Sequence, residues 1–231
     1  MIEVQGLAKY FGRHAALREL EISIPRGQFI ALFGRNGAGK TTLLRILAGL
    51  SRPSTGTVTI RGFRPGTLAA RAGIGYLSHN TALYPDMTAV ENLRFFARLL
   101  DLPCGDAGLE ERIARVGLAG RGLEPVRNYS RGMQQRLAIA RAFLHDPGLL
   151  LLDEPFTGLD QKGTEFLQSY LKEAHAAGKT CVMAIHDELL GYSLADRMVA
   201  IERGAVALDL PVASVTLDDF QSRYRALIGD R

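Results

Sequence analysis

The sequence has little of what marks exported or membrane-spanning proteins. It contains only two cysteines, Cys104 and Cys181, with no histidine or cysteine at metal-ligand spacing around either, so neither a disulfide nor a zinc site is expected. Its longest apolar runs, such as LLLL at 149–152, are far below the roughly 18 residues that span a bilayer. The first residues, MIEVQGLAKYFGRH, lack the basic start, apolar stretch and small-residue cleavage site of an export signal. We therefore expect a cytoplasmic chain that is soluble or peripheral.

The chain also has no strong excess of charge of one sign. Its net charge of +4 is modest for 231 residues and would suit phosphate ligands, nucleic acid or acidic lipid equally. Neither an internal repeat nor a low-complexity tract is found. With 47% apolar residues, the chain can bury a sizeable core in one large domain or in two closely joined lobes.

The first third alternates short β-prone segments with turns. These segments read IEVQGL, LEISI, QFIALFG, TVTIRG and GIGYL. One helix-patterned stretch, GKTTLLRILAGL, follows the third of them and ends at the turn cluster SRPSTG. This part is expected to be rich in strands, with one helix that opens directly out of a strand.

The pattern becomes helical from Asp86 to Asn128. Thr88 followed by Glu91 predicts a capping box at the first helix. The segment DLPCGDAG interrupts the pattern before a second helical stretch, so 86–128 is a candidate helical lobe. The apolar positions that support the two helices are Leu93, Phe96 and Leu100 in the first and Ile113 and Val116 in the second.

After Ser130, helices and fully apolar strands alternate. The segments are RGMQQRLAIARAFLHD, GLLLLDEP, TEFLQSYLKEAHAAG and KTCVMAIHD. Apolar strands between helices predict a parallel sheet that is buried on both faces, and Cys181 is expected in its core. The last segment predicts a short amphipathic helix with one apolar side, formed by Leu217, Phe220, Tyr224 and Leu227.

The segment GRNGAGKTT fits the pattern of a phosphate-binding loop, and it lies between an apolar strand and a helix as that motif requires. Its glycines let backbone N–H groups curl around phosphates, Lys40 can reach the β and γ oxygens, and the Thr41 hydroxyl can ligate Mg²⁺. The alternative is a glycine-rich turn without a ligand. The predicted nucleotide-binding residues of this loop are Gly34, Asn36, Gly37, Ala38, Gly39, Lys40, Thr41 and Thr42.

The segment GLLLLDEP supplies two carboxylates at the end of a buried strand. Asp153 is expected to hold Mg²⁺ through water, and Glu154 to accept a proton from the attacking water. A strand that ends in Asp-Glu is often only a strand entering a turn. Together with the phosphate loop, however, the pair predicts nucleotide hydrolysis.

The segment YSRGMQQRLAIARAF lies directly upstream of that strand. Ser130 can cap a helix whose N-terminal N–H groups face a phosphate, and Gly132 leaves room for close approach. The guanine-selecting NKxD pattern is absent, and no second chemical substrate site is evident.

Taken together, these motifs resemble the ATP-binding cassette family, the ATPase subunits of transporters. They occur in that family's order: the phosphate loop at 34–41, the signature at 130–134, the Walker B strand at 149–154, FTGLD at 156–160 and AIHD with His186. The resemblance implies an α/β fold: a P-loop NTPase core with a mainly parallel sheet, an N-terminal antiparallel β subdomain and a helical subdomain. It further implies a single ATPase domain over 1–231, with the core and β subdomain at 1–85 and 146–231 and the helical subdomain at 86–145.

The family pattern also implies partners and roles. Two cassettes would dimerise head to tail, most simply as a homodimer, with ATP and Mg²⁺ between one chain's phosphate loop and the other chain's Ser130 and Gly132. Closure would move integral membrane permease subunits, on the inner face of the cell membrane, and no nucleic acid partner is expected. His186 would contact the γ-phosphate as a catalytic residue, and Asp160 would lie in the loop that joins the two sites. Phe11, or alternatively Tyr10, would stack on adenine.

Two stretches depart from the usual family pattern. The common signature LSGGQ is replaced by YSRGM, which adds Arg131 and Met133. In YLSHNTALYP, the place of the family's glutamine falls on His79, with Asn80 next to it. We expect Asn80 near Mg²⁺ and His79 toward the helical lobe or the membrane partner, in a dimer or coupling role. Both stretches resemble ATPase subunits of the haem-exporter type associated with cytochrome c maturation.

The resemblance leaves several functions open. The first is an ATPase that drives export of haem or a related substrate for cytochrome c biogenesis, and the alternative is a multidrug, lipid or polysaccharide exporter of the ABC-2 type. A non-transport cassette protein acting on DNA or ribosomes fits less well. Such proteins carry a long coiled-coil insertion or two cassettes in one chain, and 231 residues accommodate neither.

Overall fold

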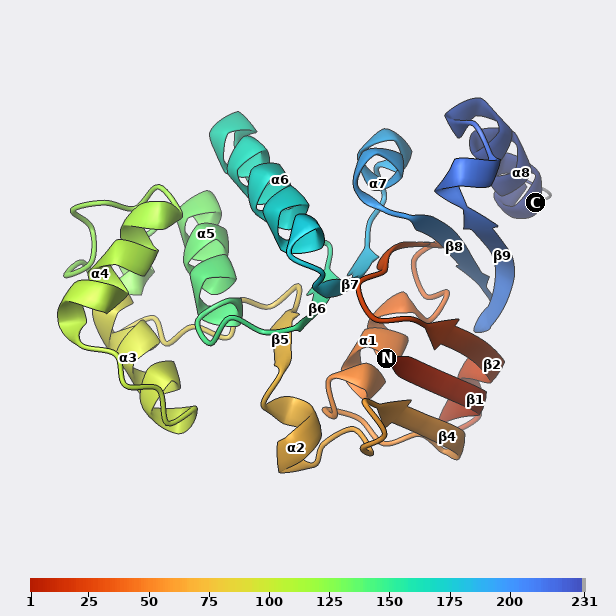
Figure 1. The fold of residues 1–231 in the computed structure, drawn as a ribbon, viewed down its shortest axis with the longest axis horizontal. Coiled ribbons are helices and arrows are strands. Elements are labelled where there is room, and N and C mark those ends of the chain that lie inside the picture. Colours follow the sequence, from red (N-terminus) through yellow and green to blue (C-terminus); the bar gives the residue numbers. More distant parts are fainter. Residues whose placement is uncertain (230–231) are drawn as a thin grey trace.

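The computed structural model describes residues 1–229, which form two β-sheets and eight α-helices (Figure 1). A three-stranded antiparallel sheet has the order β2–β1–β4, and a six-stranded sheet has the order β5–β6–β7–β3–β8–β9. The strands of the smaller sheet are β1 (Ile2–Phe11), β2 (His14–Ile24) and β4 (Thr55–Ile60). Those of the larger sheet are β3 (Phe29–Phe33), β5 (Ile74–Leu77), β6 (Leu149–Asp153), β7 (Thr180–Ala184), β8 (Arg197–Glu202) and β9 (Ala205–Pro211).

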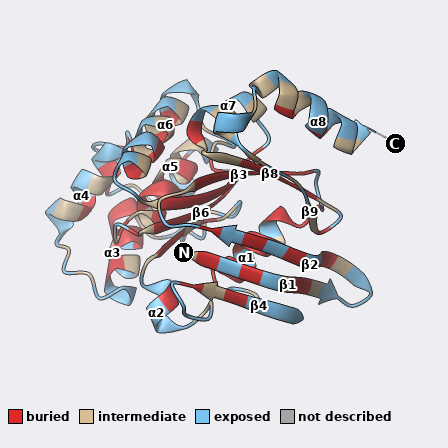
Figure 2. Ribbon diagram, turned by 45° about the vertical axis from the view of Figure 1, so that its right-hand side comes forward, coloured by how far each residue is buried: buried red, intermediate tan, exposed pale blue. Residues whose placement is uncertain are grey.

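The larger sheet is parallel except for its last strand, because β9 runs antiparallel to β8. Its central strands are buried along their whole length, as their continuous apolar sequence predicts (Figure 2). Alternate residues serve two cores: Ile30 and Leu32 face the side of the antiparallel sheet, whereas Phe29, Ala31 and Phe33 face the opposite side. The predicted fold class is thereby confirmed.

The helices cover both faces of the larger sheet. On the face of the antiparallel sheet lies α1 (Lys40–Leu47), whose buried Leu43, Leu44 and Ile46 join Ile30 and Leu32 in one core. The remaining helices are α2 (Leu68–Arg71), α3 (Ala89–Leu99), α4 (Asp106–Arg115), α5 (Arg131–Ala142), α6 (Gln161–Ala176), α7 (Glu188–Leu194) and α8 (Leu217–Gly229). Two short 3₁₀ helices span Val126–Asn128 and Val212–Ser214.

The helices α3, α4 and α5 lie together at one end of the molecule, far from the antiparallel sheet (Figure 1). The predicted capping box of α3 is confirmed: the Thr88 hydroxyl accepts from the Glu91 N–H at 3.2 Å, and the Glu91 carboxylate accepts from the Thr88 N–H at 2.8 Å. Asn92, which is fully buried, bonds the backbone of Tyr84 in both directions. The start of α3 is therefore fixed to the segment that leads into it.

Replacing Thr88 with Ala should lower the free energy of unfolding by about 1 kcal/mol, because the first turn of α3 loses the acceptor for one of its N–H groups. Denaturant titration followed by circular dichroism measures the change. Thr88→Ser is the matched control, since it keeps the hydroxyl and should stay close to wild type. Equal loss in both variants would mean that the methyl group, and not the cap, carries the effect.

The hydrophobic core does not divide at the predicted lobe boundary. Leu93 of α3 and Leu109 of α4 belong to the same buried cluster as Phe33 and Leu152 of the larger sheet. The division of the chain at 86 and 145 therefore stays a prediction. Within residues 1–229, no helix has the length and apolar character needed to span a membrane.

The C-terminal helix α8 packs on the same face of the sheet. Phe220 and Tyr224 are buried, with ring centroids 5.0 and 5.9 Å from that of Phe33, and Leu227 packs against the same core. This confirms three of the four residues of the apolar side predicted for the last segment; the fourth, Leu217, is half-buried and outside this core. Because Phe33 immediately precedes the phosphate loop, α8 supports the strand from which that loop emerges.

Candidate active site at the carboxyl end of the larger sheet

The loop at 34–39 joins β3 to α1 and is shaped by glycines that no other residue can replace without strain. Gly34 has φ 148° and Gly39 has φ 114°, both in the region that favours glycine. A Cβ at Gly34 would lie 2.4 Å from the Ile201 carbonyl oxygen, and one at Gly39 would lie 2.6 Å from that of Ala16. The loop is thus pressed between the ends of β8 and β2, with its backbone held in place.

Lys40, the first residue of α1, curls back over this loop. Its side chain is almost fully buried, and Nζ donates to the carbonyl oxygens of Gly34 at 2.5 Å and Arg35 at 3.3 Å. Burial lowers the pKa of Lys40, an effect that the nearby carboxylates of Glu154 and Asp153 oppose. Among residues 1–229 its hydrogen-bond partners are carbonyl oxygens, so the positive charge of the ammonium group is available to an anionic ligand.

Asp153 ends β6 beside the start of α1. It is 2% exposed, and its Oδ1 accepts from the Thr41 hydroxyl at 3.2 Å. Burial raises the pKa of Asp153 above its usual range, and the Thr41 hydrogen bond opposes this shift. The residues present fit Mg²⁺, which prefers oxygen ligands and commonly uses one or two carboxylates together with substrate phosphates. In residues 1–229 no group of three acidic, histidine or cysteine side chains is placed to hold a metal ion.

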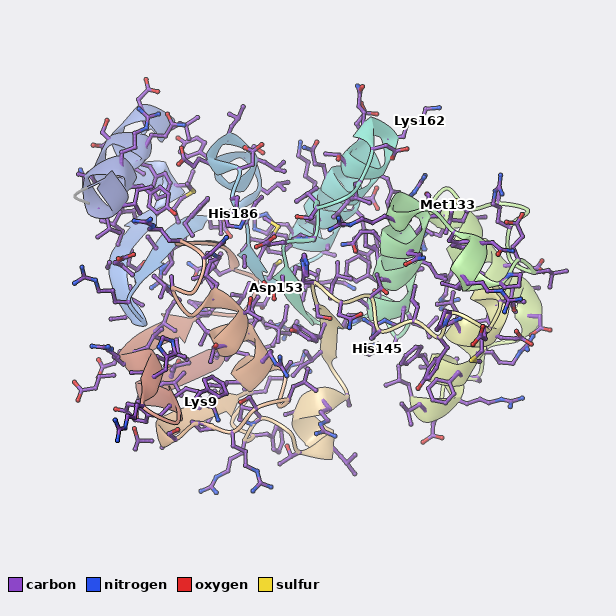
Figure 3. All side chains as sticks on the ribbon, turned by 180° about the vertical axis from the view of Figure 1, so that it is seen from behind. Lys9, Met133, His145, Asp153, Lys162 and His186 are labelled. Carbon is purple, nitrogen blue, oxygen red and sulfur yellow. The ribbon has the colours of Figure 1, made fainter. Side chains whose placement is uncertain are left out.

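Glu154 follows directly and lies against His186. His186 Nε2 is 2.8 Å from Glu154 Oε1, and both Asp153 and His186 lie near the centre of the molecule in Figure 3. Glu154 has φ 52°, a conformation that costs a non-glycine residue about 1–3 kcal/mol and that is concentrated at functional sites. Its N–H donates to the Ala184 carbonyl oxygen at 3.0 Å, which ties the strained turn to the end of β7. Three neighbouring strands therefore contribute to one site.

A cavity of about 390 Å³ opens over the phosphate loop. Phe11 stands at its rim, 56% exposed, with the Lys9 ammonium 5.0 Å from the ring centroid. Within the described part of the chain, the lining includes Phe11 and not Tyr10. The lining residues also include His14 and Arg35, which the sequence reasoning did not single out, as well as Asn36, Gly37, Ala38, Gly39, Lys40, Thr41, Thr42 and Glu154.

The signature residues begin α5 on the other side of Glu154. Ser130 caps this helix as predicted, accepting from the Met133 N–H at 3.3 Å. Gly132 lies against the segment after Glu154, where a Cβ would be 3.0 Å from the Gly158 carbonyl oxygen. Among the residues described, neither Ser130 nor Gly132 lines the phosphate-loop cavity of its own chain. The structure thus brings together the phosphate loop, the two carboxylates and His186, whereas Ser130 and Gly132 lie outside the phosphate-loop cavity.

Polar contacts fasten α5 to the segment that follows β6. The buried Gln135 donates to the Pro155 carbonyl oxygen at 3.1 Å, and Arg136 lies 3.6 Å from the Asp160 carboxylate. Asp160 also caps α6 by accepting from the Gly163 N–H at 2.9 Å. Sequence reasoning missed Gln135 and Arg136, since a polar residue in an arginine-rich helix gives no sign of which carbonyl it will meet.

His79 and Asn80 differ in their surroundings. His79 lines a small cavity of about 40 Å³ together with Glu154 and Arg131. Asn80 is exposed, and its Oδ1 accepts from the Ala82 N–H at 3.4 Å in a local turn. Among the described residues, His79 and not Asn80 lines a cavity that contains Glu154. This geometry gives no support to Asn80 as a metal ligand, and that assignment stays a prediction.

Paired substitutions test which side chain serves the site. From the cavity, we expect His79→Ala to lower the rate of ATP hydrolysis by about tenfold, as loss of a positioning group commonly does, and Asn80→Ala to change it less than about twofold. Steady-state phosphate release measures both rates. The reverse order would favour the assignment of Asn80 made from the sequence.

Comparison with known proteins agrees with this geometry. The family model described as "ABC transporter" matches residues 17–157. The uncharacterized ABC transporter ATP-binding protein YdbJ of Bacillus subtilis is 38% identical over 213 residues, covering 91% of this chain and 69% of the relative. The Nod factor export ATP-binding protein I of Cupriavidus metallidurans is 35% identical over 210 residues, covering 88% and 69%. Among solved structures, a dimeric post-hydrolysis state of the ATP-binding cassette MJ0796 bound to ADP and Pi matches with a TM-score of 0.83 and 26% identity, covering 92% of this chain and 99% of the other.

Proposed function

This chain belongs to the ABC transporter family, and on that premise we propose that it binds ATP and hydrolyses it to drive transport. The proposal rests on one observation: Lys40, the Thr41–Asp153 pair and the Glu154–His186 pair lie together at the carboxyl ends of the central strands of the larger sheet. A phosphate loop alone would support nucleotide binding. The additional carboxylate and histidine support hydrolysis.

The roles follow from chemistry and position. Backbone N–H groups of the glycine loop and the Lys40 ammonium would hold the β and γ phosphates. Thr41 and Asp153 would hold Mg²⁺, which supplies neutralisation of developing charge on the phosphate oxygens when it is bound. Glu154 would accept the proton of the attacking water, and His186 would orient Glu154 and the γ-phosphate.

A second copy of the chain would complete the site. Ser130 and Gly132 lie outside the phosphate-loop cavity of their own chain, so the proposed contact of the signature with phosphate requires another protomer. A head-to-tail homodimer meets this requirement, with Asp160 between the two sites. Closure of this dimer, on the inner face of the cell membrane, would move the integral membrane permease subunits.

The direction and cargo of transport are proposed from the two unusual stretches alone. The resemblance of YLSHN and YSRGM to the haem-exporter type favours export of haem or a related substrate for cytochrome c biogenesis. The relative from Cupriavidus is named for a different cargo, a Nod factor, so a lipid, drug or polysaccharide exporter of the ABC-2 type is the alternative.

Measurement of ATP hydrolysis by the purified chain tests the proposal. We expect phosphate release that requires Mg²⁺ and stops when a chelator removes it. Affinity purification from detergent-solubilised membranes then tests the partner. Recovery of ribosomes or DNA without a membrane subunit would contradict the transport assignment.

A further inference from the structure

A groove of about 930 Å³ lies at the C-terminal end of α1, the end opposite to the phosphate loop, between that helix, the strand β4 and the segment 64–71. It is larger than the cavity over the phosphate loop, and the roles proposed above do not use it. Three arginines, Arg52, Arg64 and Arg71, line it together with hydroxyl groups such as those of Ser51 and Thr57. Its polar side chains are therefore guanidinium groups, which only donate, and hydroxyl groups, which can donate or accept.

The charge of this groove is positive and unbalanced. Among residues 1–229, no carboxylate lines the groove, and Arg52, Arg64 and Arg71 form no ion pair there. Glu3 stands opposite Thr59 in the sheet, but its carboxylate accepts from the Ser23 hydroxyl of β2 at 2.8 Å, on the side away from β4. Three guanidinium groups around one concave surface repel one another unless an anion binds between them.

The walls of the groove are held by close backbone contacts between glycines. A Cβ at Gly49 would lie 2.3 Å from the Gly66 N, and one at Gly56 would lie 2.3 Å from the Gly6 carbonyl oxygen. The first contact fixes the end of α1 to the segment that carries Arg64, and the second fixes β4 to β1. The groove is consequently present before any ligand arrives, which reduces the entropy lost on binding.

The partial negative charge at the C-terminal end of α1 weakly disfavours the binding of an anion. A helix C-terminus carries about half a negative charge. Here two of the last carbonyl oxygens already accept hydrogen bonds: that of Ile46 from the Gly49 N–H at 2.9 Å, and that of Arg45 from the Leu50 N–H at 2.8 Å. Three full positive charges outweigh this effect. The edge position of β4 adds backbone donors, because within residues 1–229 its backbone is bridged on the side away from β1 only at its end, where Ile60 pairs with Phe63.

We infer that this groove binds a phosphate-bearing anion, through guanidinium groups that match phosphate oxygens in a bidentate manner. Its size, more than twice that of the phosphate-loop cavity, suits a ligand with more than one phosphate or with an organic body. Two sources share this chemistry: a free polyphosphate and the headgroup of an anionic phospholipid. Exposed apolar residues flank the groove, which is the arrangement that a lipid would use: Leu50, Phe63 and Leu68 are 57%, 49% and 86% exposed.

The test compares two double variants in a Lys40→Ala background, which weakens the phosphate loop. Arg64→Gln with Arg71→Gln removes two charges from the groove. Arg26→Gln with Arg98→Gln removes two charges from exposed arginines elsewhere, which form no ion pair within residues 1–229. The probes are inorganic tripolyphosphate, measured by calorimetry, and vesicles of phosphatidylcholine with and without phosphatidylglycerol, measured by cosedimentation. Thermal unfolding of each variant checks that the fold is retained.

We expect the groove variant to lose binding of at least one probe by about thirtyfold, since each arginine at an anionic surface contributes about fivefold, while the control variant stays within about twofold. Loss of tripolyphosphate binding identifies a free phosphate ligand, and loss of vesicle binding alone identifies a lipid headgroup. If both double variants bind the two probes equally, the groove is not an anion site. Because the phosphate loop is weakened equally in every sample, this result does not depend on whether the chain hydrolyses ATP.

Discussion

Replacement of Glu154 with Gln should lower the rate of ATP hydrolysis by about 10²- to 10⁴-fold, the range that loss of a general base produces, and should leave ATP binding intact. The amide has the shape of the carboxylate but cannot accept the proton of the attacking water. The phosphate loop, which lies on a different strand, is unchanged. Bound ATP therefore persists, and head-to-tail dimers should accumulate in the presence of ATP.

Single-turnover phosphate release and size-exclusion chromatography with ATP measure the two effects. Glu110→Gln is a suitable control, because this exposed glutamate of α4 is distant from the site and the substitution makes the same change of charge. Unchanged turnover in Glu154→Gln would remove this residue from its proposed role. Loss of nucleotide binding together with turnover would instead point to a disturbed fold around the strained backbone of Glu154.

Replacement of Lys40 with Ala should weaken ATP binding by about 100-fold, because a hydrogen bond to a charged group contributes about 1.5–3 kcal/mol. In the structure the ammonium is buried, and its hydrogen-bond partners among residues 1–229 are the carbonyl oxygens of Gly34 and Arg35. Its positive charge is thus directed to the interior of the loop, where the phosphates would lie.

A fluorescent ATP analogue gives the binding constant. Lys162→Ala serves as the matched control, since Lys162 projects from the exposed start of α6 (Figure 3) and its loss should leave binding within about twofold. Normal affinity in Lys40→Ala would contradict the placement of the triphosphate over this loop. The free energy of unfolding should be measured in parallel, because Lys40 is buried.

Local features of this chain were predictable because their determinants lie a few residues apart. The capping box at Thr88 and the cap at Ser130 each depend on one turn of helix, and the apolar side of α8 depends on about three turns. The phosphate loop and the carboxylates of β6 were visible for the same reason, as a spacing of glycines and a pair of acids after an apolar run. The burial of Cys181 follows from the continuous apolar character of β7.

Features that depend on long-range contacts were not predictable. The order of the larger sheet places β3 between β7 and β8, and no pattern within those strands encodes that choice. The contact of Gln135 with Pro155 depends on how α5 docks, and His79 and Glu154 come to line one cavity only after the larger sheet has formed. The core shared by the helical lobe and the larger sheet could not be predicted either, because an apolar helix face does not indicate which other element it packs against.

The sheet order has a consequence for synthesis of the chain on the ribosome. Phe29 of β3 pairs with Cys181, and Ile30 pairs with Arg197, so the strand that carries the phosphate loop has neither neighbour until the last quarter of the chain is made. At about 5–20 residues per second, this delay is about 8–30 seconds. During that time the nucleotide site cannot form, because both neighbours of β3 are missing. We expect that the nascent chain must keep the unpaired edges of β3 from pairing with other strands. A stop codon before residue 180 would therefore abolish nucleotide binding even though every residue of the phosphate loop is present.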